Sequence, residues 1–264
     1  MRVKVRKLTP AEAADGAICL QCTKNSEAVS WAIRCRTDWL MSRMKQGLSL
    51  YVAYVKRQPV GMCQCEPMEH AGWQVKDLTW MNCLFILPDY RDMGVGEKLL
   101  QFAEVDVAHR SRGLYTLPRM GGVDLTSFLL KQNFHPYDCD GEVLYGKLFR
   151  GTHEPFHARP KVLPRNRPEP NDRTVLVEHY WRASCPKEAY DSFVLRRICA
   201  RYGGRVRLHS IRQDGLAHLG KFGDAPGYVF IEGAEPKSSF KTSAEDPKVV
   251  QQAVWQALRD KELV

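Results

Sequence analysis

The sequence has no long hydrophobic run, no internal repeat and no low-complexity tract. Its longest apolar stretches, such as Cys83–Leu87, are far shorter than the roughly 20 residues that a membrane-spanning helix needs. The basic start, Met1–Lys7, leads directly into Leu8-Thr9-Pro10 without the apolar core of a secretory signal. These absences exclude disordered, fibrous and membrane-spanning classes, and we expect a cytoplasmic protein with no membrane partner.

The charge balance is basic but not concentrated in one segment. The 264 residues include 39 Lys and Arg against 30 Asp and Glu, a net charge of +9. Because the basic residues are spread along the chain, a nucleic-acid partner is not favoured. An anionic small molecule, such as a phosphorylated cofactor, accounts for the charge equally well.

A proline-rich stretch divides the chain. Residues 152–172 have neither helical nor strand periodicity and contain Pro155, Pro160, Pro164, Pro168 and Pro170. Proline lacks the N–H that regular structure needs, so this stretch is predicted to be an extended linker. The sequence therefore predicts a first domain over residues 1–150, a basic linker over 151–172 and a second domain over 173–264.

Both domains are predicted to be mixed α/β. In the first, strands are expected at Val3–Leu8, Leu48–Val55, Pro59–Cys65, Leu78–Leu87, Leu114–Leu117 and Glu142–Leu148. Helices are expected from Pro10, over Trp31–Gln46, over Gly94–Arg110 and around Leu125–Lys131. In the second, the expected order is strand Thr174–Trp181, helix Lys187–Tyr202, strands Arg205–Ile211 and Tyr228–Glu232, and helix Lys248–Lys261.

The most informative segment is Cys83–Leu100, where a strand turns at Pro88–Tyr90 and enters a helix through Arg91-x-x-Gly94-x-Gly96. Glycines allow a ligand to approach the backbone closely, and the first turn of a helix offers unpaired N–H groups and a positive dipole end. Together these features predict an anion cradle that suits a pyrophosphate.

This motif resembles the acyl-coenzyme A loop of the GNAT N-acetyltransferase superfamily. Lys131-Gln132-Asn133-Phe134, followed by the strand-like Asp140–Tyr145, resembles the closing Lys-x-Gly-Phe turn and last strand of that family. Asn133 stands where glycine is usual, and asparagine tolerates a left-handed backbone better than most residues. The resemblance implies a mixed-sheet fold with a splayed pair of central strands.

The chain resembles one GNAT branch more closely, the YoaP-type proteins, in which a smaller thioredoxin-like α/β domain follows the acetyltransferase fold. The motifs that carry this resemblance are Cys19 after Ile18, Trp39-Leu40 with Gly47-Leu48, Pro67-x-Glu69, Asn82-Cys83 and Ser184-Cys185-Pro186.

The GNAT resemblance implies a cofactor, acetyl-CoA or another acyl-CoA, and a set of residues that hold it. Backbone amides in the loop would bind the pyrophosphate, and backbone groups of the preceding strand would line the pantetheine arm. The residues so assigned are Leu84, Phe85, Ile86, Arg91, Met93, Gly94, Val95 and Gly96.

Acyl transfer also needs a base for the attacking amine and an acid for the departing thiolate. Many GNAT enzymes supply the acid as a tyrosine just before the Lys-x-Gly-Phe turn, but Leu129 occupies that place here, preceded by Phe128. Cys83, Tyr137 and Tyr145 are the alternative acids.

For the base, Glu66 and Glu69 follow a predicted strand, with His70 beside them. They could approach the substrate, or they could lie on a solvated loop. Asn82 and Cys83 lie where a strand residue would face the acyl group, and the alternative for Cys83 is a buried hydrophobic role.

The nine cysteines do not indicate a disulfide framework in a cytosolic chain. Cys19-x-x-Cys22, Cys35 and Cys63-x-Cys65 could hold a metal or form a redox pair, but their spacing matches no four-ligand set. We expect core thiols and no metal.

Cys185 differs because it precedes a predicted helix, where thioredoxin-like domains place a reactive cysteine and where the helix N-terminus stabilises thiolate. Ala225-Pro226 resembles the proline turn that faces that cysteine in the same fold. No second cysteine follows within three residues. Two interpretations are open: the second domain carries one reactive thiol, or it is a thioredoxin fold reused for binding.

The leading hypothesis is an acyl-CoA-dependent N-acyltransferase, most simply an acetyltransferase, in which a small-molecule amine attacks the bound thioester directly. The candidate catalytic residues are Glu69, Glu66, Cys83 and Cys185. One alternative is a non-catalytic coenzyme A-binding or sensor protein. Another is thiol chemistry centred on Cys185.

Overall fold

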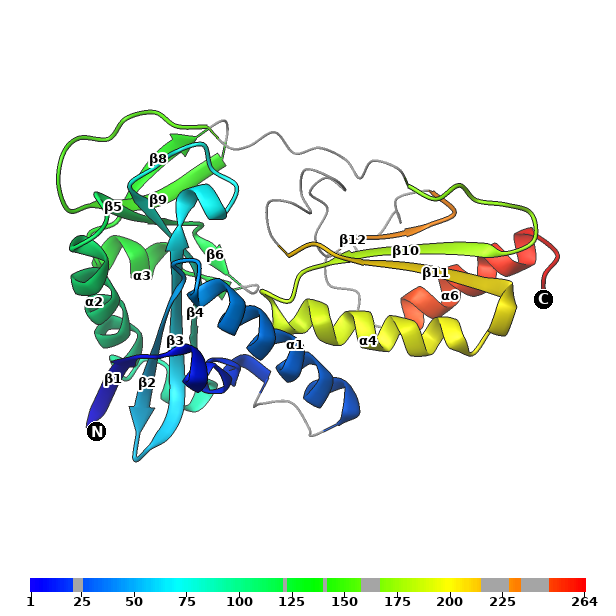
Figure 1. Ribbon diagram of the computed structural model, residues 1–264, viewed down its shortest axis with the longest axis horizontal. Helices are drawn as coiled ribbons and strands as arrows, with labels where there is room; N and C mark the ends of the chain where they lie inside the picture. Colours follow the sequence, from blue (N-terminus) through cyan, green and yellow to red (C-terminus); the bar gives the residue numbers. More distant parts are fainter. Residues whose placement is uncertain (21–25, 121–122, 140–141, 158–166, 215–227, 234–246) are drawn as a thin grey trace. The chain divides into compact units, whose positions relative to one another are not determined.

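The computed structural model describes residues 1–20, 26–120, 123–139, 142–157, 167–214, 228–233 and 247–264 (Figure 1). The chain divides into two compact units, the first comprising Met1–Cys22 and Leu40–Pro160 and the second comprising Thr23–Trp39 and Lys161–Val264. The domain limits predicted from the sequence differ from this grouping, because residues 23–39 fall in the second unit. They remain predictions.

The first unit is built on a seven-stranded mixed sheet in the order β1-β2-β3-β4-β5-β9-β8 (Figure 1). Its strands are β1 (Val3–Lys7), β2 (Ser49–Val55), β3 (Gln58–Pro67), β4 (Leu78–Ile86), β5 (Gly113–Thr116), β8 (His135–Cys139) and β9 (Glu142–Leu148). All neighbouring pairs are antiparallel except β4 and β5, which are parallel. The predicted mixed-sheet α/β fold is confirmed.

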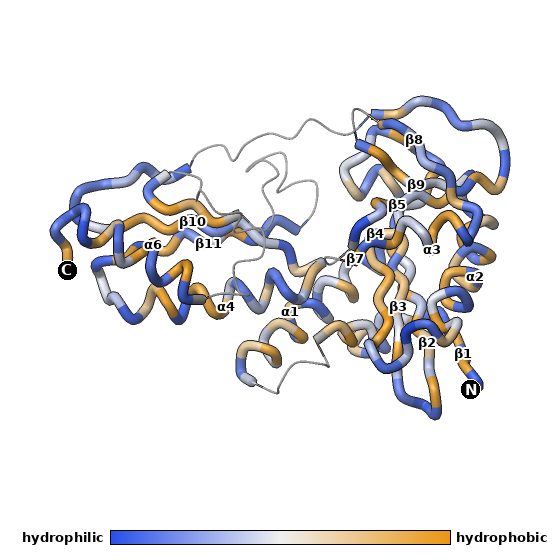
Figure 2. The backbone as a smooth tube through the Cα atoms, turned by 180° about the vertical axis from the view of Figure 1, so that it is seen from behind, coloured by the Kyte–Doolittle hydropathy of each residue, from blue (hydrophilic) through white to orange (hydrophobic). Residues whose placement is uncertain are grey.

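Helix α2 (Val95–Ala108) connects the two parallel strands and buries one face against the sheet. Its buried residues Leu99, Leu100, Ala103 and Val107 follow the helical period that the sequence shows. They share a core with side chains of β2, β3 and β4, and Figure 2 shows the hydrophobic character of the central strands.

Shorter elements complete this unit. They are the 3₁₀ helices η1 (Pro10–Gly16), η2 (Ile18–Leu20), η3 (Met68–His70) and η4 (Pro88–Tyr90), the two-residue strands β6 (Arg119–Met120) and β7 (Val123–Asp124), and helix α3 (Thr126–Lys131). Asn133, just after α3, has a φ of 62°, so asparagine does adopt the left-handed conformation for which glycine is usual in the resembled turn.

The second unit contains a three-stranded sheet in the order β11-β10-β12 among its described residues. Its elements are β10 (Val175–Trp181), α4 (Pro186–Ala200), η5 (Gly203–Arg205), β11 (Val206–Arg212), β12 (Tyr228–Ile231) and α6 (Pro247–Asp260). Strand β11 is parallel to β10 and β12 is antiparallel to it. Val175 and Val177 of β10 pack with side chains of α4 and α6 in one core.

Helix α1 (Glu27–Met44) contributes residues to both units. Its N-terminal half packs within the second unit, because the ring of Trp31 lies 5.4 Å from that of Trp181 and 5.9 Å from that of Phe193. Buried Arg36 donates a hydrogen bond to the carbonyl of Ser184.

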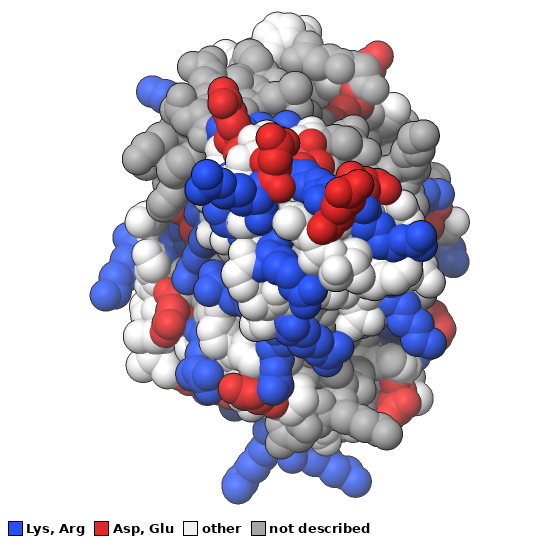
Figure 3. All heavy atoms as spheres, turned by 90° about the vertical axis from the view of Figure 1, so that its right-hand side faces the viewer, with Lys and Arg blue, Asp and Glu red and all other residues white. Residues whose placement is uncertain are grey.

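The positive charge is distributed over the surface. On the face shown in Figure 3, Lys and Arg side chains spread over much of the described surface, and Asp and Glu side chains lie among them. Within the described part of the chain, no helix is long and apolar enough to cross a membrane.

Candidate active site

The parallel strands β4 and β5 pair over only three residues and then separate. Leu78–Trp80 are in register with Gly113–Tyr115, and one further link is the hydrogen bond from Thr116 Oγ1 to the Met81 carbonyl, at 2.8 Å. Beyond it, the described residues of the two strands are no longer in register with each other. A strand pair that separates in this way matches the splayed central strands that the resemblance implies.

A β-bulge lies at the point of separation. Cys65 of β3 is opposite Met81 of β4, but Gln64 is opposite Cys83, so Asn82 is the extra residue. A bulge bends its strand and changes the direction of the side chain that it carries. Asn82 therefore lies close to the point where β4 and β5 separate.

Asn82 belongs to a chain of three polar side chains. Arg43 Nη2 donates to Glu66 Oε2 at 2.5 Å, and Asn82 Nδ2 donates to Glu66 Oε1 at 2.7 Å. The side chains of Arg43 and Glu66 are only 11% and 7% exposed. Both oxygens of the Glu66 carboxylate therefore accept hydrogen bonds in a buried environment.

The loop between β4 and α2 gathers backbone N–H groups at the other end of the open strand. Asp92 has a φ of 59° and Gly94, the N-cap of α2, a φ of 72°. Left-handed residues in such a turn direct neighbouring N–H groups toward one concavity, which adds to the positive end of the helix. Arg91 is exposed, and its Nε donates to the Ile86 carbonyl at 3.2 Å.

The space in front of the glycine loop is open at Gly94. A Cβ placed on Gly94 would meet no atom within 4 Å, so the space in front of that residue is open. A Cβ on Gly96 would lie 3.6 Å from the ring of Phe128, which closes the other side. An uncharged backbone cradle with an arginine nearby matches the needs of a phosphate group.

The other predicted cofactor residues lie along the same strand and loop. Leu84, Phe85 and Ile86 are half-buried in β4 and pack against the main core. Val95 is buried, whereas Met93 is 57% exposed at the loop. The structure thus brings the whole predicted set together along one strand-turn-helix unit.

The two candidate bases lie in different settings. Glu66 is a buried residue of β3, so the alternative that it lies on a solvated loop is wrong. Glu69 and His70 are half-buried in η3.

Among the candidate acids, Cys83 directly follows the bulge residue Asn82 in β4, and Tyr145 is opposite Thr116 in the β5–β9 pair. Tyr137 stacks on His153 with ring centroids 4.0 Å apart. Leu129 is fully buried in the core and carries no transferable proton.

Arg43 is the residue of this site that sequence reasoning missed. It continues a buried stripe of α1 that includes Ala32, Arg36 and Leu40. A cation at a buried position of a helix signals a buried partner, and the spacing of Arg36 and Arg43 along this stripe was present in the sequence.

The first-unit cysteines form no metal site among the described residues, where no group of three His, Cys, Asp or Glu side chains is placed to hold an ion. Cys63 and Cys65 lie on one face of β3 with their sulfurs 3.7 Å apart. The hydrogen bond with Cys65 and burial raise the pKa of the Cys63 thiol well above its usual range. Cys22 lies outside the described residues.

Cys185 is the N-cap residue of α4, as the sequence predicted, and it is half-buried. Cys199, further along the same helix, is buried in the core of the second unit, and burial raises the pKa of its thiol to about 12. The predicted Ala225-Pro226 turn lies outside the described residues.

Glu188, in the first turn of α4, gives the second unit a pH dependence. Burial raises the pKa of this carboxyl to about 7, although Oε2 accepts the Arg182 N–H at 2.7 Å. The folded protein therefore holds the Glu188 proton more tightly than the unfolded chain does. The stability that this proton contributes is fully present below pH 4.5, the usual pKa of the group, and is lost as the pH rises through about 7.

We expect Glu188→Gln to remove this loss of stability at high pH, because the glutamine amide oxygen still accepts the Arg182 N–H and the side chain carries no charge. Urea unfolding of both proteins at pH 5 and pH 8 tests this. The variant should gain stability relative to wild type at pH 8, and an equal difference at both pH values would contradict the assignment.

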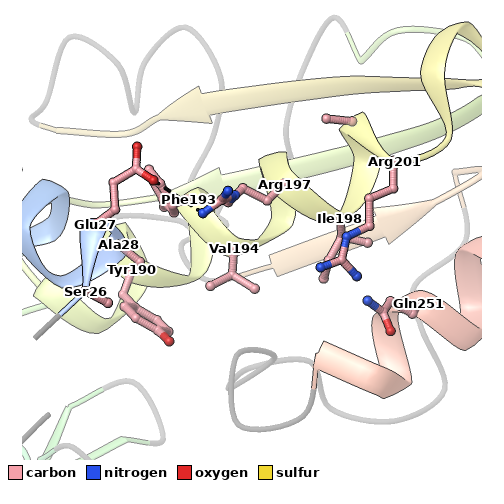
Figure 4. A pocket seen from close by; sticks show the side chains of 11 residues that line it. Ser26, Glu27, Ala28, Tyr190, Phe193, Val194, Arg197, Ile198, Arg201 and Gln251 are labelled. Atoms are coloured by element: carbon pink, nitrogen blue, oxygen red, sulfur yellow. Dashed lines mark hydrogen bonds and ion pairs between the residues drawn. The ribbon is translucent and has the colours of Figure 1, made fainter. Parts of the chain in front are cut away.

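The second unit also carries an open groove of about 750 Å³ between α4, the start of α1 and α6 (Figure 4). Phe193, Val194 and Ile198 form its apolar part, and Arg197 and Arg201 extend beside it. Arg197 pairs with Glu27 at 3.3 Å. Among the described residues, the lining contains no cysteine or histidine, and its hydroxyl groups come from Ser26 and Tyr190.

Comparison with known proteins points to the first unit. The family model of the acetyltransferase (GNAT) domain matches residues 46–136. This segment contains β2, β3, β4, α2, β5 and α3, and therefore both the splayed strands and the glycine loop. Residues 46–136 are therefore similar to a GNAT acetyltransferase domain.

A curated relative, an uncharacterized N-acetyltransferase of Archaeoglobus fulgidus, is 32% identical over 74 residues, which are 28% of this chain and 49% of that protein. The chain thus matches about half the length of this relative.

Two solved structures are also similar. PaiA N-acetyltransferase from Thermoplasma acidophilum in complex with coenzyme A has 17% identity and a TM-score of 0.40, covering 56% of this chain and 100% of that chain. A GNAT family acetyltransferase from Brucella melitensis in complex with acetyl-CoA has 16% identity and a TM-score of 0.43. The similarity covers 60% of this chain and 96% of that chain.

Proposed function

We propose that the protein is a GNAT-type N-acyltransferase that uses acetyl-CoA and transfers the acyl group to an amine of a small molecule. The observation that carries this proposal is the combination of a strand pair that opens at a bulge with a glycine-capped helix at the end of the same open strand. The match of residues 46–136 to the GNAT domain covers both features.

The backbone of Met93, Gly94, Val95 and Gly96 would hold the pyrophosphate, with Arg91 adding positive charge. Leu84, Phe85 and Ile86 would line the pantetheine arm. When bound, acetyl-CoA supplies an acyl group activated as a thioester. The chain's task is to place that group at the opening beside Asn82, exclude water and direct the amine toward it.

The transfer forms one C–N bond and breaks one C–S bond. The amine nitrogen loses one proton, and the departing sulfur gains one. We propose Glu69 as the first candidate to accept the proton, because both oxygens of Glu66 already accept hydrogen bonds. Tyr145, opposite Thr116, is the candidate donor, and Cys83 in the open strand is the second.

We further propose that the second unit is a thioredoxin-like domain of the YoaP type. A central β10 flanked by parallel β11 and antiparallel β12, with α4 leading from β10 to β11, supports this proposal because it is part of the arrangement expected of such a domain. The position of Cys185 at the start of α4 supports the same proposal. A cytoplasmic location remains part of the proposal.

Calorimetric titration with acetyl-CoA, followed by an assay of thiol release with a panel of primary amines, tests the proposed function. Binding with amine-dependent release of coenzyme A supports the transferase. Binding without release from any amine would favour the non-catalytic coenzyme A-binding protein. Absence of binding would contradict both and direct attention to Cys185.

Cys185→Ser should leave acetyl-CoA affinity unchanged and lower turnover of the acceptor that uses the second unit. The reason is that Cys185 lies in the second unit, whereas the proposed cofactor residues all lie in the first. Calorimetry and steady-state kinetics on the variant measure the two effects separately. Unchanged turnover would assign the thiol a structural role.

A further inference from the structure

We propose that Asn82 binds the acceptor amine and selects primary amines over secondary ones. In this arrangement the side-chain Oδ1 accepts an N–H from the attacking nitrogen, while Glu66 and Arg43 hold the amide in position. The inference rests on the proposed function, because it concerns the acceptor side of the same proposed site.

The orientation of the Asn82 amide is fixed by its neighbour. A carboxylate only accepts hydrogen bonds, so the atom that faces Glu66 Oε1 at 2.7 Å must be the donor Nδ2. Turning the amide over would place Oδ1 against a carboxylate oxygen. Oδ1 must therefore point away from Glu66.

Oδ1 has no hydrogen-bond partner among the described residues, although it is buried. A buried acceptor that lacks a partner destabilises the protein. Such a group, at the bulge where β4 and β5 separate, is suited to a ligand that brings a donor.

Arg43 makes the site suitable for a neutral amine. A lone buried carboxylate would attract an ammonium cation, whose lone pair is not available for attack. Because Arg43 pairs with Glu66, the group that the substrate meets is an uncharged amide. An uncharged amide attracts an ammonium ion less strongly than a carboxylate does, so the amine can lose its proton before it attacks.

The number of N–H bonds on the acceptor then decides selectivity. A primary amine has two, of which one is lost in the transfer and the other stays in the product amide. The Oδ1 of Asn82 can accept this remaining N–H before, during and after the transfer. A secondary amine has only the N–H that must leave, so it loses this contact as the new C–N bond forms.

The first test is a titration of ¹⁵N-labelled wild-type protein with methylamine in the presence of coenzyme A. The side-chain amide signals of Asn82, assigned by their loss in Asn82→Ala, should shift saturably. A control Gln101→Ala, which removes an exposed amide on α2, should titrate like wild type. Asn82 signals that do not move at saturating methylamine would overturn the inference, and this test needs no turnover.

The second test compares kcat/KM for methylamine and dimethylamine. Asn82→Ala should lower the primary-to-secondary ratio at least tenfold while the Kd for acetyl-CoA stays within twofold. An unchanged ratio would overturn the inference even if the transferase is real. A saturable Asn82 shift without any amine turnover would instead support amine binding by Asn82 and contradict the proposed transfer.

Glu66→Gln separates positioning from base catalysis. If Glu66 positions Asn82, its replacement should raise KM for methylamine severalfold and change kcat little. Loss of kcat by the hundredfold or more that follows removal of a general base, with KM unchanged, would contradict the positioning role.

Discussion

Gly94→Asp is expected to weaken acetyl-CoA binding at least 30-fold, about 2 kcal/mol. Gly94 has a left-handed backbone with a φ of 72°, which aspartate and asparagine both adopt more readily than most other residues. The open space in front of its Cα is where the pyrophosphate would lie, so the new carboxylate would meet it at the positive end of α2. Calorimetric titration measures the loss.

Gly94→Asn is the matched control, because asparagine has the same size, carries no charge and tolerates a positive φ. It should lose several-fold less affinity than Gly94→Asp. If the two variants lose affinity equally, backbone strain rather than charge is responsible. If neither loses affinity, the loop does not bind the cofactor.

Arg43→Met is expected to destabilise the protein by about 3–5 kcal/mol, because it leaves the buried carboxylate of Glu66 without its cation. Urea unfolding monitored by tryptophan fluorescence and circular dichroism gives the value. The same substitution at Arg6, which forms an exposed pair with Glu12, should have little effect.

The double variant Arg43→Met/Glu66→Leu distinguishes lost charge from lost packing. Replacement of a whole buried ion pair by apolar side chains is often neutral or stabilising. We therefore expect the double variant to recover most of the stability that Arg43→Met loses. A double variant as unstable as the sum of its single changes would contradict the ion-pair explanation.

The parts of the site that were predictable lie close together in the sequence. The strand ending near Ile86, the turn at Pro88 and the helix starting at Gly94 form one continuous segment, in which each local signal points to the same structure. The period of Leu99, Ala103 and Val107 fixes which face of α2 is buried.

The parts that were not predictable depend on register and on distant contacts. The three members of the Arg43–Glu66–Asn82 chain come from α1, β3 and β4, and their meeting depends on a bulge that one extra residue creates. Strand β8 was missed because it is a short, mostly exposed edge strand that contains Pro136.

The start of α1 shows how a local signal can be overlooked. The helix was predicted from Trp31 but begins at Glu27, where the preceding Ser26 accepts the N–H of Val29 through its hydroxyl at 3.2 Å. A serine before a helical stretch is a recognised start signal. The apolar residues follow a clear helical period only from Trp31 onward, and the helix was therefore predicted to start there.

A crystal structure of the protein with coenzyme A tests the central claim most directly. The account predicts the pyrophosphate on the backbone N–H groups of residues 93–96 and the sulfur in the opening beside Met81 and Thr116. Coenzyme A bound in the groove beside α4, or bound without contact to this loop, would contradict it.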